Sequence, residues 1–159
     1  MPQESPQVLW LDAPEEHDYP AAAAYLQLFA GPELIAGLVA QLRAAPTVRQ
    51  KAKDLLRASR LPLLEQGNKH VAADLRKVEH GHRLSPVLLV RGDIHSGTPL
   101  LVADGYHRIC ASYHLDENTD IPCRLAVIGG GLPAGQAGTT GTASSAGTAG
   151  TAGTAGTAR

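Results

Sequence analysis

The chain has 159 residues, carries 14 basic and 15 acidic side chains, and is 43% hydrophobic by residue count. This length fits one domain, and its two cysteines, Cys110 and Cys123, are too few for a secreted disulfide scaffold and lack zinc-ligand spacing. No apolar run approaches the length of a membrane span and no signal-peptide pattern opens the sequence. We therefore expect a soluble cytoplasmic protein with no membrane partner.

The composition divides the chain into three stretches. Residues 1–60 form an acidic N-terminal segment followed by expected helices, and residues 61–128 hold the strand-like runs. Residues 129–159 contain ten of the 17 glycines, repeat Gly-Thr-Ala, and carry no charge before Arg159. Because this stretch has almost no apolar side chain larger than alanine, we expect a disordered, low-complexity tail that is a tether or a repeat expansion.

Charge is segregated along the chain although the net charge is only -1. Residues 1–20 carry five acids and no base, whereas residues 43–91 carry eleven bases and four acids. A local basic excess suits phosphates, on a nucleotide or on nucleic acid. The alternative is a solvated face that the acidic N-terminus partly neutralises.

Apolar spacing predicts helices in the first half. A helix over residues 21–29 follows Pro20, with Tyr25, Leu28 and Phe29 on a core-facing stripe, and a second core-facing helix covers residues 34–42. After Pro46, a capping-box pattern and an apolar stripe predict a third helix; these residues are Thr47, Gln50, Val48, Ala52, Leu55 and Leu56. A fourth, short helix places Val71, Leu75 and Val78 in register and ends at Gly81.

The second half has the pattern strand, strand, helix, strand. The run SPVLLV, residues 85–90, predicts a buried strand, and a long loop connects it as a hairpin to a strand over residues 100–103. A helix over residues 109–115 is entered directly from Asp104-Gly105, and residues 121–128 form the last strand. The expected fold class is α+β, with a helical N-terminal half packed on a small mixed sheet.

The junction Asp104-Gly105-Tyr106-His107-Arg108, called the corner below, stands where a strand ends and a helix begins. Unpaired amides and the macrodipole of a helix N-terminus attract anions, and Gly105 allows a sharp turn and a close ligand approach. His107 and Arg108 would add donors to phosphate oxygens, while Asp104 would cap the helix or hold a metal ion. Alternatively, Asp104 only caps, Arg108 pairs with an acid, and His107 is an ordinary exposed histidine.

Residues 61–127 contain three segments, HVAADLRKVEHGHRLSPVLLV, ADGYHRICASYHL and DIPCRLA. Together these segments resemble the ParB/sulfiredoxin superfamily. The resemblance implies a sheet of that type and a corner that holds the phosphates of ATP, ADP or CTP, with Gly105, Tyr106, His107 and Arg108 as ligands. It also implies that the helix near His70 faces the phosphates, which makes Lys69, His70 and Lys77 further phosphate-binding candidates. On this basis Arg108→Ala would remove nucleotide affinity and leave the fold intact.

Within that superfamily, the corner is most similar to the Asp-Gly-His-His-Arg sequence of the free serine kinases. Sulfiredoxins carry a catalytic cysteine where this chain has Tyr106, and no helix-turn-helix follows as in ParB, so neither activity is expected. Cys110 and Cys123 are expected to be small core residues. The kinase resemblance implies phosphoryl transfer to a small hydroxyl substrate with Mg²⁺ at Asp104, and with Glu65, Asp104 and His107 as catalytic candidates.

Three functions remain open from the sequence. The leading prediction is a nucleotide-phosphate-binding protein, either an NTPase or a small-molecule kinase. The first alternative is a ParB-like nucleic-acid-binding or nuclease module, and the second is a non-catalytic interaction protein. In that last case the N-terminal helices would form an oligomer or partner surface.

Overall fold

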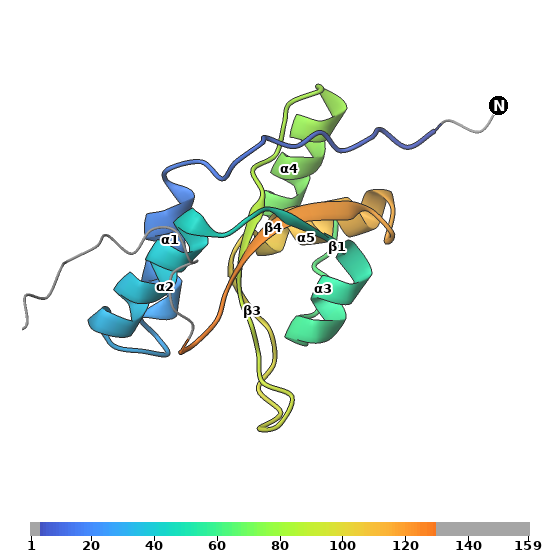
Figure 1. The fold of residues 1–159 in the computed structure, drawn as a ribbon. Helices are drawn as coiled ribbons and strands as arrows, with labels where there is room; N and C mark the ends of the chain where they lie inside the picture. The colour runs from blue at the N-terminus through green and yellow to red at the C-terminus, as the bar shows by residue number, and fades with distance from the viewer. Residues whose placement is uncertain (1–3, 130–159) are drawn as a thin grey trace, which may run out of the picture.

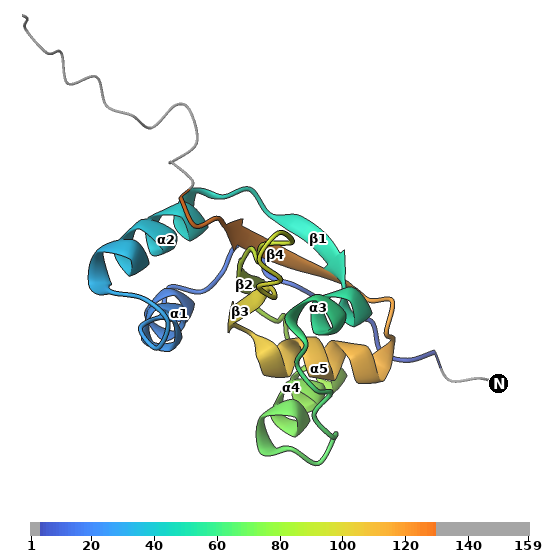
Figure 2. The same cartoon turned by 90° about the horizontal axis from the view of Figure 1, so that it is seen from below.

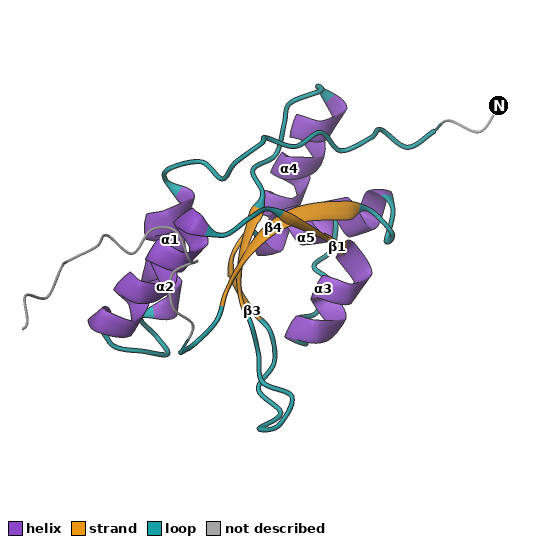
Figure 3. Cartoon of the chain, viewed as in Figure 1, coloured by secondary structure: helices purple, strands orange, loops and turns teal. Residues whose placement is uncertain are grey.

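The computed structural model describes residues 4–129, so all but the first residue of the expected tail lies outside the described part of the chain. Within this range it is an α+β protein with five helices and one four-stranded mixed sheet, which confirms the expected fold class (Figures 1 and 3). The elements in chain order are α1 (Asp18–Leu26), α2 (Pro32–Ala44), β1 (Val48–Lys51), α3 (Ala52–Ser59), α4 (Lys69–Glu79), β2 (Val87–Val90), β3 (Leu101–Asp104), α5 (Tyr106–Leu115) and β4 (Asp120–Ala126).

The sheet has the order β1-β4-β2-β3. β2 and β3 form the expected antiparallel hairpin, and the connection through α5 returns the chain to β4, which runs parallel to β2. β1 closes the other edge by pairing antiparallel with β4. α5 thus lies in a crossover between two parallel strands, and it begins where β3 ends.

Helices cover both faces of the sheet (Figure 2). α1 and α2 pack on one face, against side chains that include Leu88 and Val90. α3, α4 and α5 pack on the other face, against side chains that include Val87 and Leu89. Because neighbouring residues of a strand point to opposite faces, the continuous apolar run of β2 supplies both cores at once, as the sequence pattern indicated.

α4 ends as predicted. Gly81 has a φ of +73°, and the amide of His82 donates to the carbonyl of Lys77 at 2.8 Å. This is the backbone pattern with which a left-handed glycine closes a helix. At the other end, the side chain of Asn68 accepts from the amides of His70 and Val71 and caps the first turn.

The capping box predicted at Thr47 and Gln50 is wrong, because those residues precede or lie in strand β1. Val48 is 40% exposed and pairs with Cys123 of β4 instead of joining the apolar stripe of a helix. The helix begins at Ala52, where the amides of Ala52 and Lys53 donate to carbonyls of the loop before β4, each at 3.0 Å. Main-chain carbonyls from a distant segment therefore replace the expected side-chain cap.

The buried face expected for the first helix is also wrong. α1 begins at Asp18, with Pro20 inside its first turn, and buries Tyr19, Ala22 and Leu26. The three side chains predicted to face the core are exposed: Tyr25 at 36%, Leu28 at 75% and Phe29 at 57%. Leu28 and Phe29 lie beyond the end of the helix at Leu26, and the stripe that faces the sheet is formed by Tyr19, Ala22 and Leu26.

Among residues 4–129, no helix has both the length and the apolar character that a bilayer span requires.

Candidate functional site

The corner has the predicted strand-to-helix geometry. β3 ends at Asp104, Gly105 adopts a φ of +105°, and α5 begins at Tyr106. No side chain caps this helix start, in contrast to α4. The first turn of α5 therefore presents amide donors without a side-chain acceptor from the described residues.

Gly105 is required by close packing as well as by its φ. A Cβ at this position would lie 2.5 Å from Cγ1 of Val87 and 2.9 Å from Nη2 of Arg108. The space that the glycine leaves open is thus filled by β2 and by the arginine of the corner. The expected close approach of a ligand on this side is not available.

Arg108 points inward, not toward a solvent-exposed phosphate site. Its side chain is 12% exposed, its Nη2 donates to Asp104, and its Nη1 donates to Oδ2 of Asp18 at 3.4 Å. Asp18, which is 4% exposed in its side chain, also accepts a hydrogen bond from Ser85. This corrects the predicted role of Arg108 as a phosphate clamp and matches the alternative in which it pairs with acids.

Asp104 is correspondingly not a helix cap. Burial is the main cause that raises its pKa, and the nearby Asp18 carboxylate acts in the same direction, while the Arg108 guanidinium opposes both. Two acids and one base thus form a partly buried cluster, which we call the ion-pair cluster (Asp18, Asp104, Arg108). Because Arg108 occupies the Asp104 carboxylate, the residue does not fit the predicted magnesium-ligand role.

His107 lies on the exposed side of the corner with two aromatic neighbours. Its ring centroid is 4.7 Å from that of His70 at the start of α4 and 5.7 Å from that of Tyr106. Partial burial and then the adjacent His70 lower the pKa of His107, whereas Asp74 opposes the shift. The structure therefore brings together His70 and His107, two of the predicted phosphate-binding candidates, and the surroundings of His107 disfavour its protonated form.

The two predicted lysines differ in their surroundings. Lys69 is exposed at the first position of α4 and has no ion-pair partner among residues 4–129. Lys77 pairs with Asp74 at 3.2 Å on the same helix. Of the two, Lys69 keeps its charge available next to His70.

Tyr106 contacts the loop between α3 and α4, and Glu65 lies in that loop. The hydroxyl of Tyr106 donates to the carbonyl of Pro62, which fastens the loop before α4 to the start of α5. Glu65 is exposed, and its carbonyl accepts from the amide of Asn68 at 3.0 Å. Within the described residues its carboxylate makes no hydrogen bond or ion pair.

Both cysteines are buried, as expected for core residues. Burial raises the pKa of Cys110 and raises the pKa of Cys123 to about 11, so each thiol is protonated at neutral pH.

Sequence reasoning missed Asp18 and Ser85. Asp18 was seen only as one of five N-terminal acids, and its partners lie 67 and 90 residues away in the chain. No local pattern marks such a residue.

Glu15, His17 and Asp18 offer possible metal-ligand atoms within 4.8 Å of one another. The carboxylate of Asp18 already accepts from Ser85 and Arg108, and His17 lies within 3.5 Å of Glu15.

Comparisons with protein-family models, with curated proteins and with solved structures found no match to this chain.

Proposed function

We propose that the protein binds the phosphate groups of a nucleotide at the start of α5, in a domain of ParB/sulfiredoxin type. The observation that carries this proposal is the contact between His70 and His107, 4.7 Å between ring centroids, beside a helix start that no side chain caps. Two imidazoles and the amide donors of the first turn of α5 then lie close together. Anions are favoured by such a combination.

The chemistry of the two histidines suits a ligand that arrives with its own negative charge. A neutral imidazole offers one N–H donor, and an approaching phosphate favours protonation, which turns the second ring nitrogen into a donor. Lys69 adds an ammonium group next to His70. The phosphate-binding set supported by the structure is therefore the amides of Tyr106 and His107 together with the side chains of Lys69, His70 and His107.

Arg108 supports the proposed site without binding phosphate, in contrast to its predicted role as a phosphate clamp. Its contacts with Asp104 and Asp18 join the start of α5 to α1 and hold the first turn in place. It is thus a positioning residue for the amides. Lys77, which pairs with Asp74, has a similar structural explanation.

The activity that we propose for this binding site is that of an NTPase or a small-molecule kinase. Glu65 is the exposed carboxylate in the loop that Tyr106 holds against α5, and it remains our candidate for the base that orients an attacking hydroxyl or water. The ion-pair cluster does not fit Mg²⁺, because both of its carboxylates accept from Arg108. We therefore assign no catalytic step to a metal at Asp104.

The test is isothermal titration calorimetry with ATP, ADP and CTP, each with and without Mg²⁺. We expect His107→Gln and His70→Gln each to weaken binding about tenfold, which corresponds to about 1.4 kcal/mol. The matched control is the pair His80→Gln and His82→Gln, whose rings also lie close together, 6.3 Å between centroids, but at the C-terminal end of α4. There the helix dipole disfavours anions.

The proposal also has a pH signature. Because the pKa of His107 is lowered in the unliganded protein, affinity is expected to increase as pH falls from about 7.5 to about 5.5. Absence of binding for every nucleotide, or equal losses in the control variants, would overturn the proposal.

The nucleic-acid alternative receives less support. Four of the eleven bases between residues 43 and 91 pair with carboxylates: Arg43 with Glu16, Lys51 with Asp120, Arg57 with Asp54, and Lys77 with Asp74. Their charge is thereby partly neutralised, as in the solvated-face alternative. A gel shift at low salt with steep salt dependence would restore this function.

A further inference from the structure

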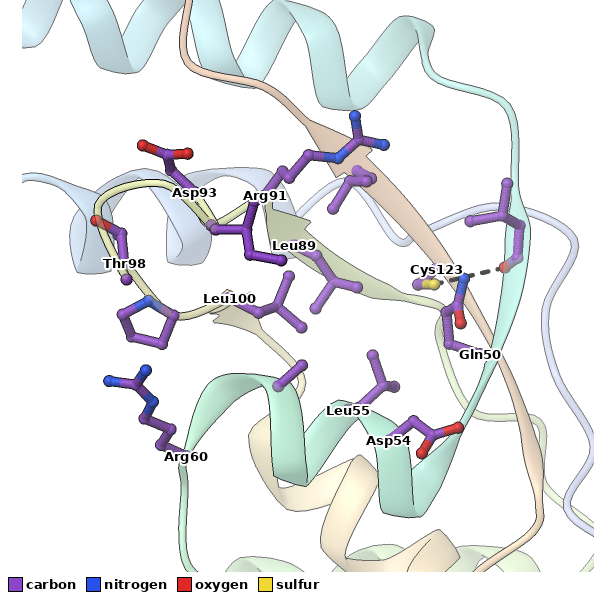
Figure 4. Close-up of a pocket in the computed structure, with 17 residues that line it drawn as sticks. Gln50, Asp54, Leu55, Arg60, Leu89, Arg91, Asp93, Thr98, Leu100 and Cys123 are labelled. Atoms are coloured by element: carbon purple, nitrogen blue, oxygen red, sulfur yellow. Dashed lines mark hydrogen bonds between the residues drawn. The ribbon is translucent and has the colours of Figure 1, made fainter.

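A cavity of about 710 Å³ lies between α3, one face of the sheet and the loop that joins β2 to β3 (Figure 4). None of its lining residues belongs to α4 or α5, so it is separate from the proposed phosphate site. The side chains of Leu55, Leu89 and Leu100 converge on its middle, while the charged ends of Arg60 and Arg91 lie at its edge. Its volume is within the usual range of small-molecule pockets.

The walls of this cavity are fixed by main-chain contacts. The amide of Leu100 donates to the carbonyl of Ala58 in α3 at 3.0 Å, and the amide of Arg91 donates to Ala126 of β4 at 2.9 Å. At Gly92, a Cβ would lie 2.2 Å from the carbonyl oxygen of Thr98, so the two arms of the loop pack closely. The loop is therefore fastened to both neighbours, and the cavity is formed before any ligand binds.

The cavity is lined by two acids, Asp54 and Asp93, and by two arginines, so its formal charge is zero, but within the described part of the chain only the acids have partners. Asp93 accepts from the amides of His95 and Ser96, and Asp54 lies 3.6 Å from Arg57. Among residues 4–129, the guanidinium groups of Arg60 and Arg91 have no hydrogen-bond or ion-pair partner. An apolar interior thus meets two unpaired cations at its opening.

The deep wall is apolar and unreactive. Cys123 donates weakly to the carbonyl of Val48 at 3.5 Å and is fully buried. Its protonated thiol contributes a soft, apolar surface. The cavity consequently favours reversible burial of hydrocarbon over covalent chemistry.

We propose that this cavity binds a small amphiphilic carboxylate, with its hydrocarbon body among Leu55, Leu89 and Leu100 and its carboxylate at Arg60 or Arg91. Burial of hydrocarbon supplies the affinity, and the planar guanidinium supplies the preference for a carboxylate. The site is independent of the nucleotide proposal.

The experiment compares three probes with an eight-carbon chain, namely octanoate, 1-octanol and octyltrimethylammonium, by calorimetry and by amide chemical-shift mapping on the full chain. We expect octanoate to bind at least tenfold more tightly than the cation and to shift the amides of residues 89–100. Ala58→Phe, which fills the cavity from α3, should reduce octanoate binding at least tenfold. Unfolding curves check that this variant still folds.

Arginine variants test the charge at the edge without altering the core. Arg60→Gln and Arg91→Gln together should weaken octanoate at least tenfold and leave 1-octanol unchanged. The matched control is Arg76→Gln, an exposed arginine on α4 outside the cavity. Equal affinity for the acid and the cation, equal losses in the control, or a dimer that covers the cavity and dissociates in Ala58→Phe would each overturn the proposal.

Discussion

Removal of the Arg108 guanidinium should destabilise the fold itself. Arg108→Ala leaves Asp18 and Asp104 facing each other without their shared cation, in side chains that are only 4% and 22% exposed. Breaking a buried ion pair in this way costs about 3–5 kcal/mol, and the partial exposure of Asp104 favours the lower end, about 3 kcal/mol. The sequence alone predicted that this variant would leave the fold intact.

Urea unfolding followed by the fluorescence of Trp10 provides the assay, because this is the single tryptophan of the chain and it packs against the core that contains Ile109. With a slope of about 2 kcal/mol per molar urea, the expected loss lowers the midpoint by about 1.5 M. The matched control is Arg57→Ala, which removes an exposed pair with Asp54 and should change stability by less than about 0.5 kcal/mol.

The pH dependence gives a second readout. The pKa of Asp104 is raised in the folded protein, so its contribution to stability is fully present below its unfolded value and is lost as pH rises through the folded value. Without Arg108 that pKa rises further, since the one opposing charge is gone. The deficit of Arg108→Ala should therefore be largest near pH 7 and smaller near pH 4. Equal midpoint shifts for the two arginine variants at pH 7 would refute this reasoning.

Three further predictions test the local structure. Gly105→Ala combines a positive φ with a 2.5 Å contact to Val87 and should cost about 2–5 kcal/mol, measured by thermal unfolding; a loss below about 1 kcal/mol would contradict the packing described. Asn68→Ala should cost about 1 kcal/mol and Thr47→Ala almost nothing, because only Asn68 caps a helix; urea midpoints distinguish the two. With its pKa near 11, Cys123 should react with a thiol reagent far more slowly than a free cysteine at pH 8, and complete labelling within minutes in the folded protein would argue against its burial.

Much of the second half of the fold could be predicted from the sequence because its signals are local. The apolar run of β2, the glycine that ends α4 and the glycine that opens α5 each act within a few residues. β1 could not be predicted in the same way. It is four residues long, two of them charged, and it is a strand only because it pairs with a segment some 70 residues later.

At the candidate site, too, some features could be predicted from the sequence and others depend on distant residues. The resemblance implied that His70 and His107 both face the phosphates, and in the structure their rings lie close together. The orientation of Arg108 did not follow, because it depends on Asp18, which lies 90 residues away and carries no distinguishing pattern. A guanidinium beside a helix start suits either a phosphate or a carboxylate, and only the tertiary structure decides which is nearby.

The composition of β1 also has a consequence for solubility. A strand at the edge of a sheet exposes unused main-chain donors and acceptors, which invite a strand of another molecule. β1 carries Arg49 and Lys51 in four residues; Lys51 pairs with Asp120, so Arg49 is the charge that two copies approaching edge to edge would bring together. The polar composition that makes β1 hard to predict from the sequence thus also disfavours aggregation along the β1 edge of the sheet.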